Sequence, residues 1–412
     1  MTKGKKPLFQ TKEYEEGLLP YVDIKAFETG IVDNYTDGQK CLFCEDGDIL
    51  LVCDGSRSGL VGYAIEGYVG STLAKLSADG LINSYLYYFL QSKYQILNTN
   101  QKGTGTPHVN PEVLKNFEIS VPSISEQERI VARIEELFSQ LDKSVETLQK
   151  VKEQLVVYRQ AVLKDAFEGK LTEDWRVLNN KTQNVSKDYE SIKLSNITFK
   201  DISGDENELV LKLPETWRLT RFGEVFNIEV GGTPKRVVDE YWNGDLPWVS
   251  SGEVQFNQIN YTAEMITEKG LLESSTKLQQ KGTVLLAMIG EGKTRGQVAI
   301  LGIDATHNQN IAAIQVSKTP CNSKYIYYFL ELNYENIRRT GSGNNQKALN
   351  KERVKAIRFP FTTFAEQNEI VSILDMKLSV NDNIEKYIKD SLEKAQAMRQ
   401  SILKQAFEGK LV

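Results

Sequence analysis

Residues 125–171 read SEQERIVARIEELFSQLDKSVETLQKVKEQLVVYRQAVLKDAFEGKL, and this stretch decides the fold. Apolar side chains recur along it at alternating steps of four and three, with only Ser144 breaking the series: Ile130, Ile134, Leu137, Leu141, Leu148, Val151, Leu155, Tyr158 and Val162. A heptad pattern sustained for about five repeats predicts one long helix with an apolar stripe. Ser125 followed by Glu126 and Glu128 predicts its start, and Gly169 predicts its end.

The stripe needs a partner, because a helix cannot bury its own apolar face; the alternative is a long helix lying on a globular core. The partner is expected in the same chain, since residues 366–411 repeat residues 126–171 at a constant offset of 240. The second stripe is poorer, because Lys377 and Asn381 replace two leucines of the first. A gap-free repeat of this length indicates an internal duplication that contains both helices.

The globular segments are duplicated as well. Gly4, Pro7 and Tyr14 return as Gly231, Pro234 and Tyr241 at an offset of 227, and the aromatic run at 85–90 returns at 325–330. Turn-bounded β-like runs at 48–53 and 60–65, the aromatic helix, and a last strand at 117–121 predict an α/β (α+β) domain with mixed sheets. The predicted order of segments is a first domain at 1–121, a helix at 122–171, a polar connection with little core at 172–212, a second domain at 213–361, and a helix at 362–412.

Agreement between the two domains is weakest at residues 23–46 against 250–281. Two domains that keep the same framework but differ in their loops are typical of proteins that recognise two different targets. Unconstrained sequence drift would give the same pattern.

The composition narrows the functional classes. The chain has 412 residues and a formal net charge of −5, with no apolar run near the ~20 residues of a membrane helix and no secretory signal in residues 1–14, so we expect a cytoplasmic protein. The charge argues against a simple basic nucleic-acid binder but does not exclude DNA, because local patches set phosphate contacts. Cys41 and Cys44 have zinc-site spacing, but no second pair follows and both histidines are isolated, so we expect no metal.

Catalytic motifs are weak. Residues 287–294, AMIGEGKT, have the spacing of a phosphate-binding loop, yet the following residues 295–301 predict a strand where such a loop requires a helix. The sequence also lacks the glycine-rich cofactor loop and the catalytic turn of a methyltransferase, as well as a clear nucleophile–base pair. We therefore expect no enzyme activity and no cofactor.

With catalysis and metal binding set aside, contact with DNA is the function that the remaining motifs suggest. Ser56, Arg57 and Ser58 lie between two glycines after one strand, and Lys293, Thr294 and Arg295 lie between two glycines in the matching place of the second domain. Arginine can bind guanine in bidentate fashion, asparagine and glutamine suit adenine, and hydroxyls or lysine suit phosphate. Each loop alone is more typical of a solvated turn, but recurrence in both halves favours DNA contact. The further candidates are Lys102, Thr104, Thr106, Lys235, Arg236, Arg338, Arg339, Asn344, Asn345, Gln346 and Lys347.

The whole pattern resembles the specificity (S) subunits of type I restriction–modification enzymes. The resemblance rests on the helix entry Glu-Gln-x-x-Ile-Val, the helix exit Ala-Phe-Glu-Gly-Lys-Leu, and Gly231-Gly-Thr-Pro234, and it covers nearly the whole chain. It implies two target recognition domains that each read one half of a split DNA sequence. It also implies two helices that pack as an antiparallel coiled coil, set the spacer and dock two methyltransferase (modification) subunits, with a restriction subunit joining for cleavage. By this resemblance the partner-binding candidates are Glu126, Gln127, Phe167, Leu171, Glu366, Gln367, Phe407 and Leu411.

One departure concerns the start of the first domain. Thr2 aligns with Glu229, so nothing in this sequence matches the segment at 217–230, whose alternation predicts a docked edge element. We expect the first domain to be N-terminally short, with an edge covered by the connection, by self-association or by residues lost at a late-assigned start. The competing interpretation of the whole chain is a coiled-coil scaffold for proteins without DNA specificity.

Overall fold

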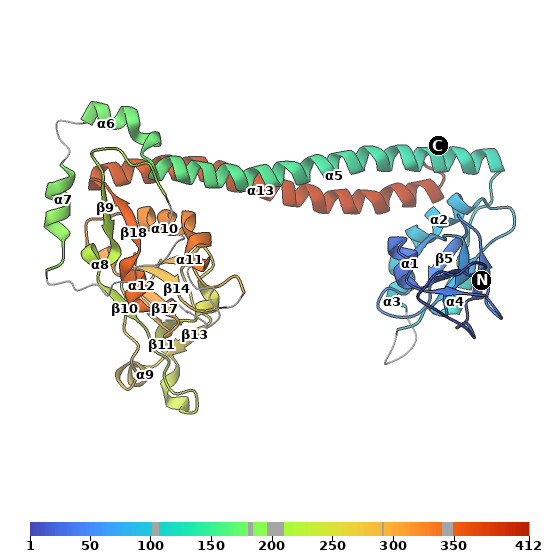
Figure 1. Ribbon diagram of the computed structural model, residues 1–412, viewed down its shortest axis with the longest axis horizontal. Helices are drawn as coiled ribbons and strands as arrows, with labels where there is room; N and C mark the ends of the chain where they lie inside the picture. Colours follow the sequence, from blue (N-terminus) through green and yellow to red (C-terminus); the bar gives the residue numbers. More distant parts are fainter. Residues whose placement is uncertain (101–106, 180–183, 196–209, 291, 340–348, 412) are drawn as a thin grey trace. The chain divides into compact units, whose positions relative to one another are not determined.

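The computed structural model describes residues 1–100, 107–179, 184–195, 210–290, 292–339 and 349–411 (Figure 1). The chain forms two compact units: unit 1 is Met1–Val151 with Lys386–Val412, and unit 2 is Lys152–Glu385. Each unit therefore combines one globular domain with part of each long helix, α5 (Ile124–Phe167) and α13 (Phe364–Phe407). Both predicted helices are confirmed, but they are shared between the units. None of the described helices is long and apolar enough to cross a membrane.

Unit 1 holds two four-stranded sheets, in the orders β1-β8-β5-β6 and β3-β2-β7-β4. The first is antiparallel throughout, and the second is mixed because β2 and β7 run parallel. The predicted strands at 48–53 and 60–65 are β5 and β6, and the aromatic helix is α2. The elements are β1 (Thr2–Lys3), β2 (Leu19–Val22), α1 (Ile24–Thr29), β3 (Tyr35–Thr36), β4 (Phe43–Cys44), β5 (Ile49–Val52), β6 (Val61–Tyr63), β7 (Gly67–Val69), β8 (Leu73–Leu76), α2 (Asn83–Ser92), α3 (Tyr94–Thr99) and α4 (Pro111–Lys115).

Unit 2 repeats this plan with a five-stranded sheet, β10-β17-β14-β15-β12, whose first four strands correspond to β1-β8-β5-β6. Two smaller sheets, β13-β11-β16 and β18-β9, complete the unit. Its elements are η1 (Lys170–Thr172), α6 (Glu173–Asn179), α7 (Val185–Ile192), β9 (Arg218–Arg221), α8 (Phe222–Val225), β10 (Ile228–Val230), η2 (Asp239–Tyr241), β11 (Trp242–Val249), η3 (Ser251–Glu253), β12 (Asn257–Ile259), β13 (Glu264–Ile266), α9 (Glu268–Leu272), β14 (Val284–Ala287), β15 (Val298–Leu301), β16 (Thr306–His307), β17 (Ile311–Ile314), η4 (Val316–Lys318), α10 (Ser323–Leu332), α11 (Tyr334–Arg339), α12 (Lys351–Ala356) and β18 (Arg358–Phe361).

The two long helices pack in opposite directions. In unit 1, Ile130 and Ile134 near the start of α5 share a core with Leu403 near the end of α13. In unit 2, Leu163 near the end of α5 shares a core with Ile370 near the start of α13. An antiparallel pair follows from these two contacts.

The middle of the apolar stripe is less buried than the heptads predict. Leu141, Leu148, Val151 and Leu155 are half-buried, and Tyr158 is 43% exposed. Two helices alone cannot cover a stripe from all sides, so full burial is reached where a globular domain adds a third surface. The start of α5 also differs from the prediction. The Ser123 hydroxyl accepts a hydrogen bond from the Glu126 N–H (3.3 Å), so Ser123 takes the place predicted for Ser125. Gly169 ends α5 with a positive φ of 71°, as predicted.

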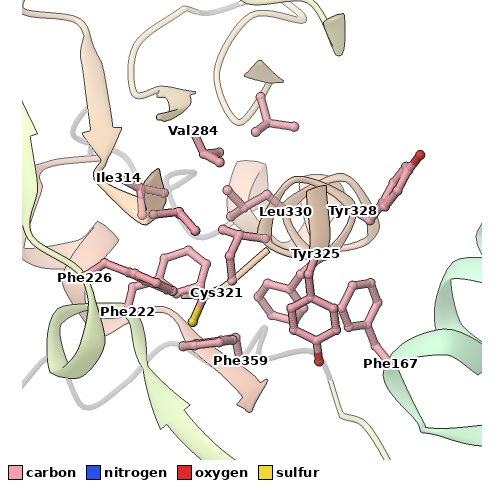
Figure 2. Packing of buried hydrophobic residues seen from close by; sticks show 14 of the residues in the cluster. Phe167, Phe222, Phe226, Val284, Ile314, Cys321, Tyr325, Tyr328, Leu330 and Phe359 are labelled. Atoms are coloured by element: carbon pink, nitrogen blue, oxygen red, sulfur yellow. The ribbon is translucent and has the colours of Figure 1, made fainter. Parts of the chain in front are cut away.

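The end of each long helix is part of a domain core, and Figure 2 shows Phe167 of α5 beside Tyr325 in the core of unit 2. In unit 2, the Phe167 ring of α5 lies 5.0 Å from Tyr325 and 5.4 Å from Phe329, both on α10. In unit 1, the Phe407 ring of α13 lies 5.1 Å from Tyr85 and 5.4 Å from Phe89 on α2. These pairs match at the offset of 240. Fully burying a phenylalanine, as at Phe167, is worth about 1.5–3 kcal/mol, and the half-buried Phe407 contributes less. Each domain is therefore stabilised by the end of a helix that starts at the other domain.

Two sequence predictions are corrected outside the long helices. Residues 117–121 were expected to form a strand, but they do not, although their counterpart β18 pairs with β9. No described segment of unit 1 pairs with residues 117–121 as β9 pairs with β18, and Val121 is 58% exposed. The connection at 172–212 was expected to have little core. Its described part forms η1, α6 and α7, and Tyr189 is buried in the core of unit 2, where its hydroxyl donates to Glu224 (2.8 Å).

A glutamine at the start of each long helix fastens the helix to its domain. In unit 2, Gln367 Nε2 donates to the Thr362 carbonyl (2.9 Å), and its Oε1 accepts from the Asn322 N–H (3.1 Å) beside α10. In unit 1, Gln127 Nε2 donates to the Pro122 carbonyl (3.0 Å), and its Oε1 accepts from the Ile82 N–H (2.9 Å) beside α2. Both side chains are fully buried. The same two bonds recur at an offset of 240 residues, so duplication preserved this clamp.

The preceding glutamates differ between the units. Glu366 is buried and accepts hydrogen bonds from Thr172 (2.8 Å), Trp217 Nε1 (2.9 Å), Arg176 and Thr362. Glu126 is exposed. Four donors around one buried carboxylate satisfy its lone pairs, and they bind the connection and the segment before β9 to the start of α13.

Replacing Gln367 by alanine should destabilise unit 2. The change leaves the N–H of half-buried Asn322 and the carbonyl of buried Thr362 without their partner, and each such loss costs about 1–3 kcal/mol when the group is buried. We expect a loss of roughly 2–4 kcal/mol in the free energy of unfolding, measured by denaturant titration, with faster hydrogen exchange at the first turn of α10. Gln160→Ala, an exposed glutamine on α5, is the matched control and should change stability by less than about 0.5 kcal/mol. Equal effects of the two changes would refute the clamp.

Candidate functional site

The predicted basic loop of unit 2 is packed against α11. The Tyr334 hydroxyl donates to the Lys293 carbonyl (2.6 Å), and Arg338 Nη1 donates to the Tyr334 hydroxyl (2.5 Å). Arg295 Nη2 donates to the Arg338 carbonyl (3.0 Å). The structure thus brings Lys293 and Thr294 to the surface on which Arg338 and Arg339 lie, although 43 residues separate Arg295 from Arg338.

Close approach of the loop to α11 depends on Gly296. It has a φ of +87°, and a Cβ there would lie 3.2–3.4 Å from Tyr334, Ile337 and Arg338. The packing also changes the role of Arg295. Its side chain is half-buried and braces α11, so it does not present a free guanidinium fork for guanine, whereas Lys293 is exposed.

Unit 1 has the same arrangement with different chemistry. Asn98 on α3, the counterpart of Arg338, donates through Nδ2 to the carbonyls of Ser56 (3.2 Å) and Ser58 (2.9 Å). Ser58 is fully buried, so its prediction as a DNA contact is wrong: its backbone holds the loop against α3. Arg57 is exposed and forms an ion pair with Glu28 of α1, and Ser56 is exposed.

A charged cluster centred on Asp54 lies next to the Ser56–Ser58 loop of unit 1. Asp54 Oδ2 lies 2.8 Å from Lys3 Nζ, and Asp54 Oδ1 lies 2.7 Å from His108 Nδ1. Burial by itself raises the pKa of Asp54, but its hydrogen bonds with Lys3 and His108 outweigh burial and hold that pKa below its ordinary value. The Gly55 N–H also donates to the Pro107 carbonyl (2.8 Å). The chain after the predicted Lys102–Thr106 loop therefore returns to the Ser56–Ser58 loop.

Several predicted residues lie outside the described residues. They are Lys102, Thr104, Thr106, Asn344, Asn345, Gln346 and Lys347. Lys235 and Arg236 follow β10 and are exposed. The Arg236 guanidinium stacks 3.9 Å from the centre of the Trp242 ring and pairs with Glu264 (Nη2–Oε2 2.9 Å), and this hydrogen bond raises its pKa. Lys235 is the freer of the two cations.

Sequence reasoning missed an amide-rich edge in unit 2. Strand β12 is the last strand of the five-stranded sheet, and exposed amides lie on and around it: Gln255, Asn257, Gln258 and Asn260. Phe256 has a positive φ of 54° and its ring packs edge-on at 5.0 Å against Tyr334, which also binds the Lys293 loop. Amide side chains and the basic loop thus share one surface. The clue in the sequence was the run QFNQIN at 255–260, inside the segment where the two domains agree least.

The predicted partner-binding residues are mostly internal. Phe167, Gln127, Glu366 and Gln367 are buried in the core and clamp contacts described above, so their prediction as partner contacts is corrected. Phe407, Leu171 and Leu411 are half-buried and pack against the same cores, and Glu126 is exposed. Apart from Glu126, these residues pack in the domain cores or clamps, which accounts for their recurrence in both halves.

The apparent phosphate-binding motif has the wrong structure for that role. Strand β14 precedes it, and strand β15 follows it, so no helix opens toward a phosphate. Cys44 is buried with Sγ 3.4 Å from the Gly67 carbonyl, and burial raises its pKa to about 11, which disfavours the thiolate that zinc requires. Within the described ranges, no three His, Cys, Asp or Glu side chains converge as metal ligands would.

Comparison with known proteins agrees with this architecture. The model of the type I restriction modification DNA specificity domain matches residues 1–155 and 214–394. The type I restriction enzyme MjaVIII specificity subunit of Methanocaldococcus jannaschii is 24% identical over 99% of this chain and 90% of its own length. The EcoBI specificity subunit of Escherichia coli is 22% identical over 95% of this chain and 80% of its own length.

Two solved structures show the same fold. The HsdS subunit from Thermoanaerobacter tengcongensis has a TM-score of 0.56 at 17% identity, covering 95% of this chain and 91% of that one. A chain from a structure on complex assembly and conformational transition of the type I R-M system has a TM-score of 0.69 at 18% identity, covering 95% and 92%. Because the family model matches both halves of the chain, this chain belongs to the family of type I restriction modification DNA specificity domains.

Proposed function

We propose that this chain is the sequence-specific DNA-recognition subunit of a type I restriction–modification complex. Two methyltransferase subunits and, in the full complex, a restriction subunit supply the chemistry, and this chain supplies the choice of target in the cytoplasm. The observation that carries the proposal is the duplicated site: each unit holds a glycine-flanked loop against a short helix on an equivalent frame. The family match covers both copies.

Each globular domain, at about residues 1–121 and 213–361, then reads one half of a bipartite target. In unit 2, exposed Lys293 is suited to phosphate, while the amides of Asn257 and Gln258 are suited to adenine. In unit 1, Ser56 and Arg57 occupy the equivalent loop. Equivalent frames with different surface side chains support two half-sites of different sequence.

The two long helices then set the unspecified gap between the half-sites. A helix of 44 residues is about 66 Å long at 1.5 Å per residue, long enough to separate two major-groove contacts one turn, ~34 Å, apart. The formal charge of −5 is compatible with this role if the methyltransferase subunits neutralise much of the phosphate backbone. Specific binding should therefore require the assembled complex.

Asn257→Ala and Gln258→Ala should each relax the base requirement at one position of one half-site. A bidentate amide–adenine contact discriminates by ~1–3 kcal/mol, and the other half-site should stay unchanged. The measurement is methylation sequencing of a library of bipartite targets, using the complex with methyltransferase subunits. Asn383→Ala, an exposed amide on α13, is the matched control. Equal weakening for all target sequences would assign these amides to the backbone and not to bases.

Lys293→Ala should behave differently, because a lysine that binds phosphate carries no sequence information. We expect weaker binding of all targets alike and a decrease of about 1 in the slope of log K against log salt. Titration of the assembled complex on specific and random duplexes at several salt concentrations provides the test. A changed sequence preference with an unchanged salt slope would contradict the assignment.

Insertion of one heptad into both helices, at 140–155 of α5 and 380–395 of α13, should lengthen the recognised gap. Seven residues add about 10 Å, or roughly three base pairs, and keep the stripe in phase. Both half-site sequences should stay the same in methylation sequencing. A three-residue insertion is the control, since it rotates the stripe out of register and should impair assembly. An unchanged gap after the heptad insertion would contradict the role of the two helices as a spacer.

A further inference from the structure

Unit 1 has a cavity of about 490 Å³ that is lined by α2 and by the parts of α5 and α13 that belong to this unit. Tyr87 and Tyr88 line it from α2, Glu135 and Phe138 from α5, and Arg399 from α13. It is lined by aromatic rings and charged groups, and no established role in this chain accounts for it.

The aromatic lining is continuous. The ring centres of Tyr87 and Tyr88 are 5.0 Å apart, and those of Tyr88 and Phe138 are 5.8 Å apart. Tyr63 continues the row, with its ring centre 4.5 Å from Tyr87. Burial, and then the neighbouring Tyr87 and Glu135, raise the pKa of Tyr63 to about 12. Neutral phenol rings beside a carboxylate provide the negative π faces and the counter-ion that bind an organic cation.

Two positive side chains line the cavity: Arg399 is engaged within the chain, whereas Lys143 has no ion pair among the described residues. Arg399 forms an ion pair with Asp142 and stacks 4.8 Å from the centre of the Phe138 ring. Glu135, by contrast, has no ion pair among the described residues, and its one hydrogen bond there is a long one from the Tyr88 hydroxyl (3.5 Å). Glu135 is exposed, so its carboxylate is accessible to a cation from outside the chain.

The duplicate of this site in unit 2 shows what is missing. Asp375, the counterpart of Glu135, accepts hydrogen bonds from Lys324 Nζ (2.6 Å) and the Tyr328 hydroxyl (2.6 Å). Position 84 of unit 1, which corresponds to Lys324, is a serine. Unit 2 thus neutralises this carboxylate from within the same chain, and unit 1 does not.

A second exchange distinguishes the two copies. Arg159, the counterpart of Arg399, pairs with Glu331 (Nε–Oε1 2.5 Å) in unit 2. Unit 1 has Gln91 in place of Glu331, and Gln91 bonds to the Tyr87 hydroxyl instead (2.5 Å). Unit 2 therefore has two internal ion pairs at this place, Lys324–Asp375 and Arg159–Glu331, that unit 1 lacks.

We propose that the cavity of unit 1 binds a lysine or arginine side chain of a methyltransferase subunit, with Glu135 as counter-ion and Tyr87, Tyr88 and Phe138 as the π surface. The inference rests on the proposed function, which supplies the partner. Charge complementarity favours a basic protein side chain, since the carboxylate of Glu135, which has no ion pair among the described residues, repels DNA phosphates. The two methyltransferase subunits then dock non-equivalently, because only unit 1 of the described structure has this unneutralised carboxylate.

The test measures, by calorimetry at two salt concentrations, how tightly the full chain and its variants assemble with the methyltransferase subunits. Glu135→Gln should weaken assembly about tenfold, the size of a partly desolvated cation–π and charge-assisted contact, and should reduce its salt dependence. Ser84→Lys copies the internal cation of unit 2, so it should weaken assembly to a similar extent while thermal stability is kept or raised. Glu136→Gln, an adjacent exposed glutamate paired with Arg133, is the matched control and should have no effect.

Unchanged assembly by both Glu135→Gln and Ser84→Lys would overturn the proposal, as would an effect confined to self-association of the chain. An assembled complex that responds to both variants but recognises no specific DNA would instead refute the proposed function and leave the site standing. If the Glu136→Gln control weakened assembly tenfold, as Glu135→Gln does, the effect would come from general surface charge and not from the cavity. That result would also overturn the proposal.

Discussion

The ring of Phe167 enters a core that it shares with Tyr325 and Phe329, 158 or more residues further along the chain. Phe407 does the same with Tyr85 and Phe89 of the first domain. Each long helix thus starts at one domain, and its end completes the core of the other. The antiparallel pair, the division of both helices between the units, and the clamps of Gln127 and Gln367 all depend on this burial.

Duplication gave the two halves the same backbone framework, and sequence divergence then changed the side chains that this framework carries at its surface. The glutamine clamps share two equivalent hydrogen bonds, because a buried amide that lost either partner would leave unsatisfied backbone groups; Gln127 Nε2 donates in addition to the Gly80 carbonyl (2.7 Å). The loops on α3 and α11 keep their close packing, but with different side chains: Asn98 of the helix makes the contact in unit 1, whereas Tyr334 of the helix and Arg295 of the loop make it in unit 2. Stability is thereby conserved where polar groups are buried, and chemistry varies where they face solvent.

An acidic chain that recognises DNA requires a division of labour. Lysine and arginine residues at the candidate surface are partly used within the protein: Arg57 pairs with Glu28, Arg236 with Glu264, and Arg295 with a helix carbonyl. Such pairing fixes loop geometry but reduces the charge available to phosphates. Partner subunits that add positive surface would supply affinity, while loops and the β12 edge of this chain would supply selection.

The sequence alone determined the two long helices, their ends at the AFEGKL repeats, the duplication and the family resemblance, because heptads and repeats are local and periodic signals. It also identified β14 and β15 as strands on either side of a false phosphate-binding motif. Only the tertiary structure decided which residues were buried. Phe167, Gln127 and Glu366 look like exposed signature residues in a linear pattern, yet they lie in cores that residues far along the chain complete. The missing strand at 117–121, the brace made by Arg295, and the joining of Phe256 to Tyr334 depend on partners that no local pattern specifies, since pairing and burial are properties of the folded chain.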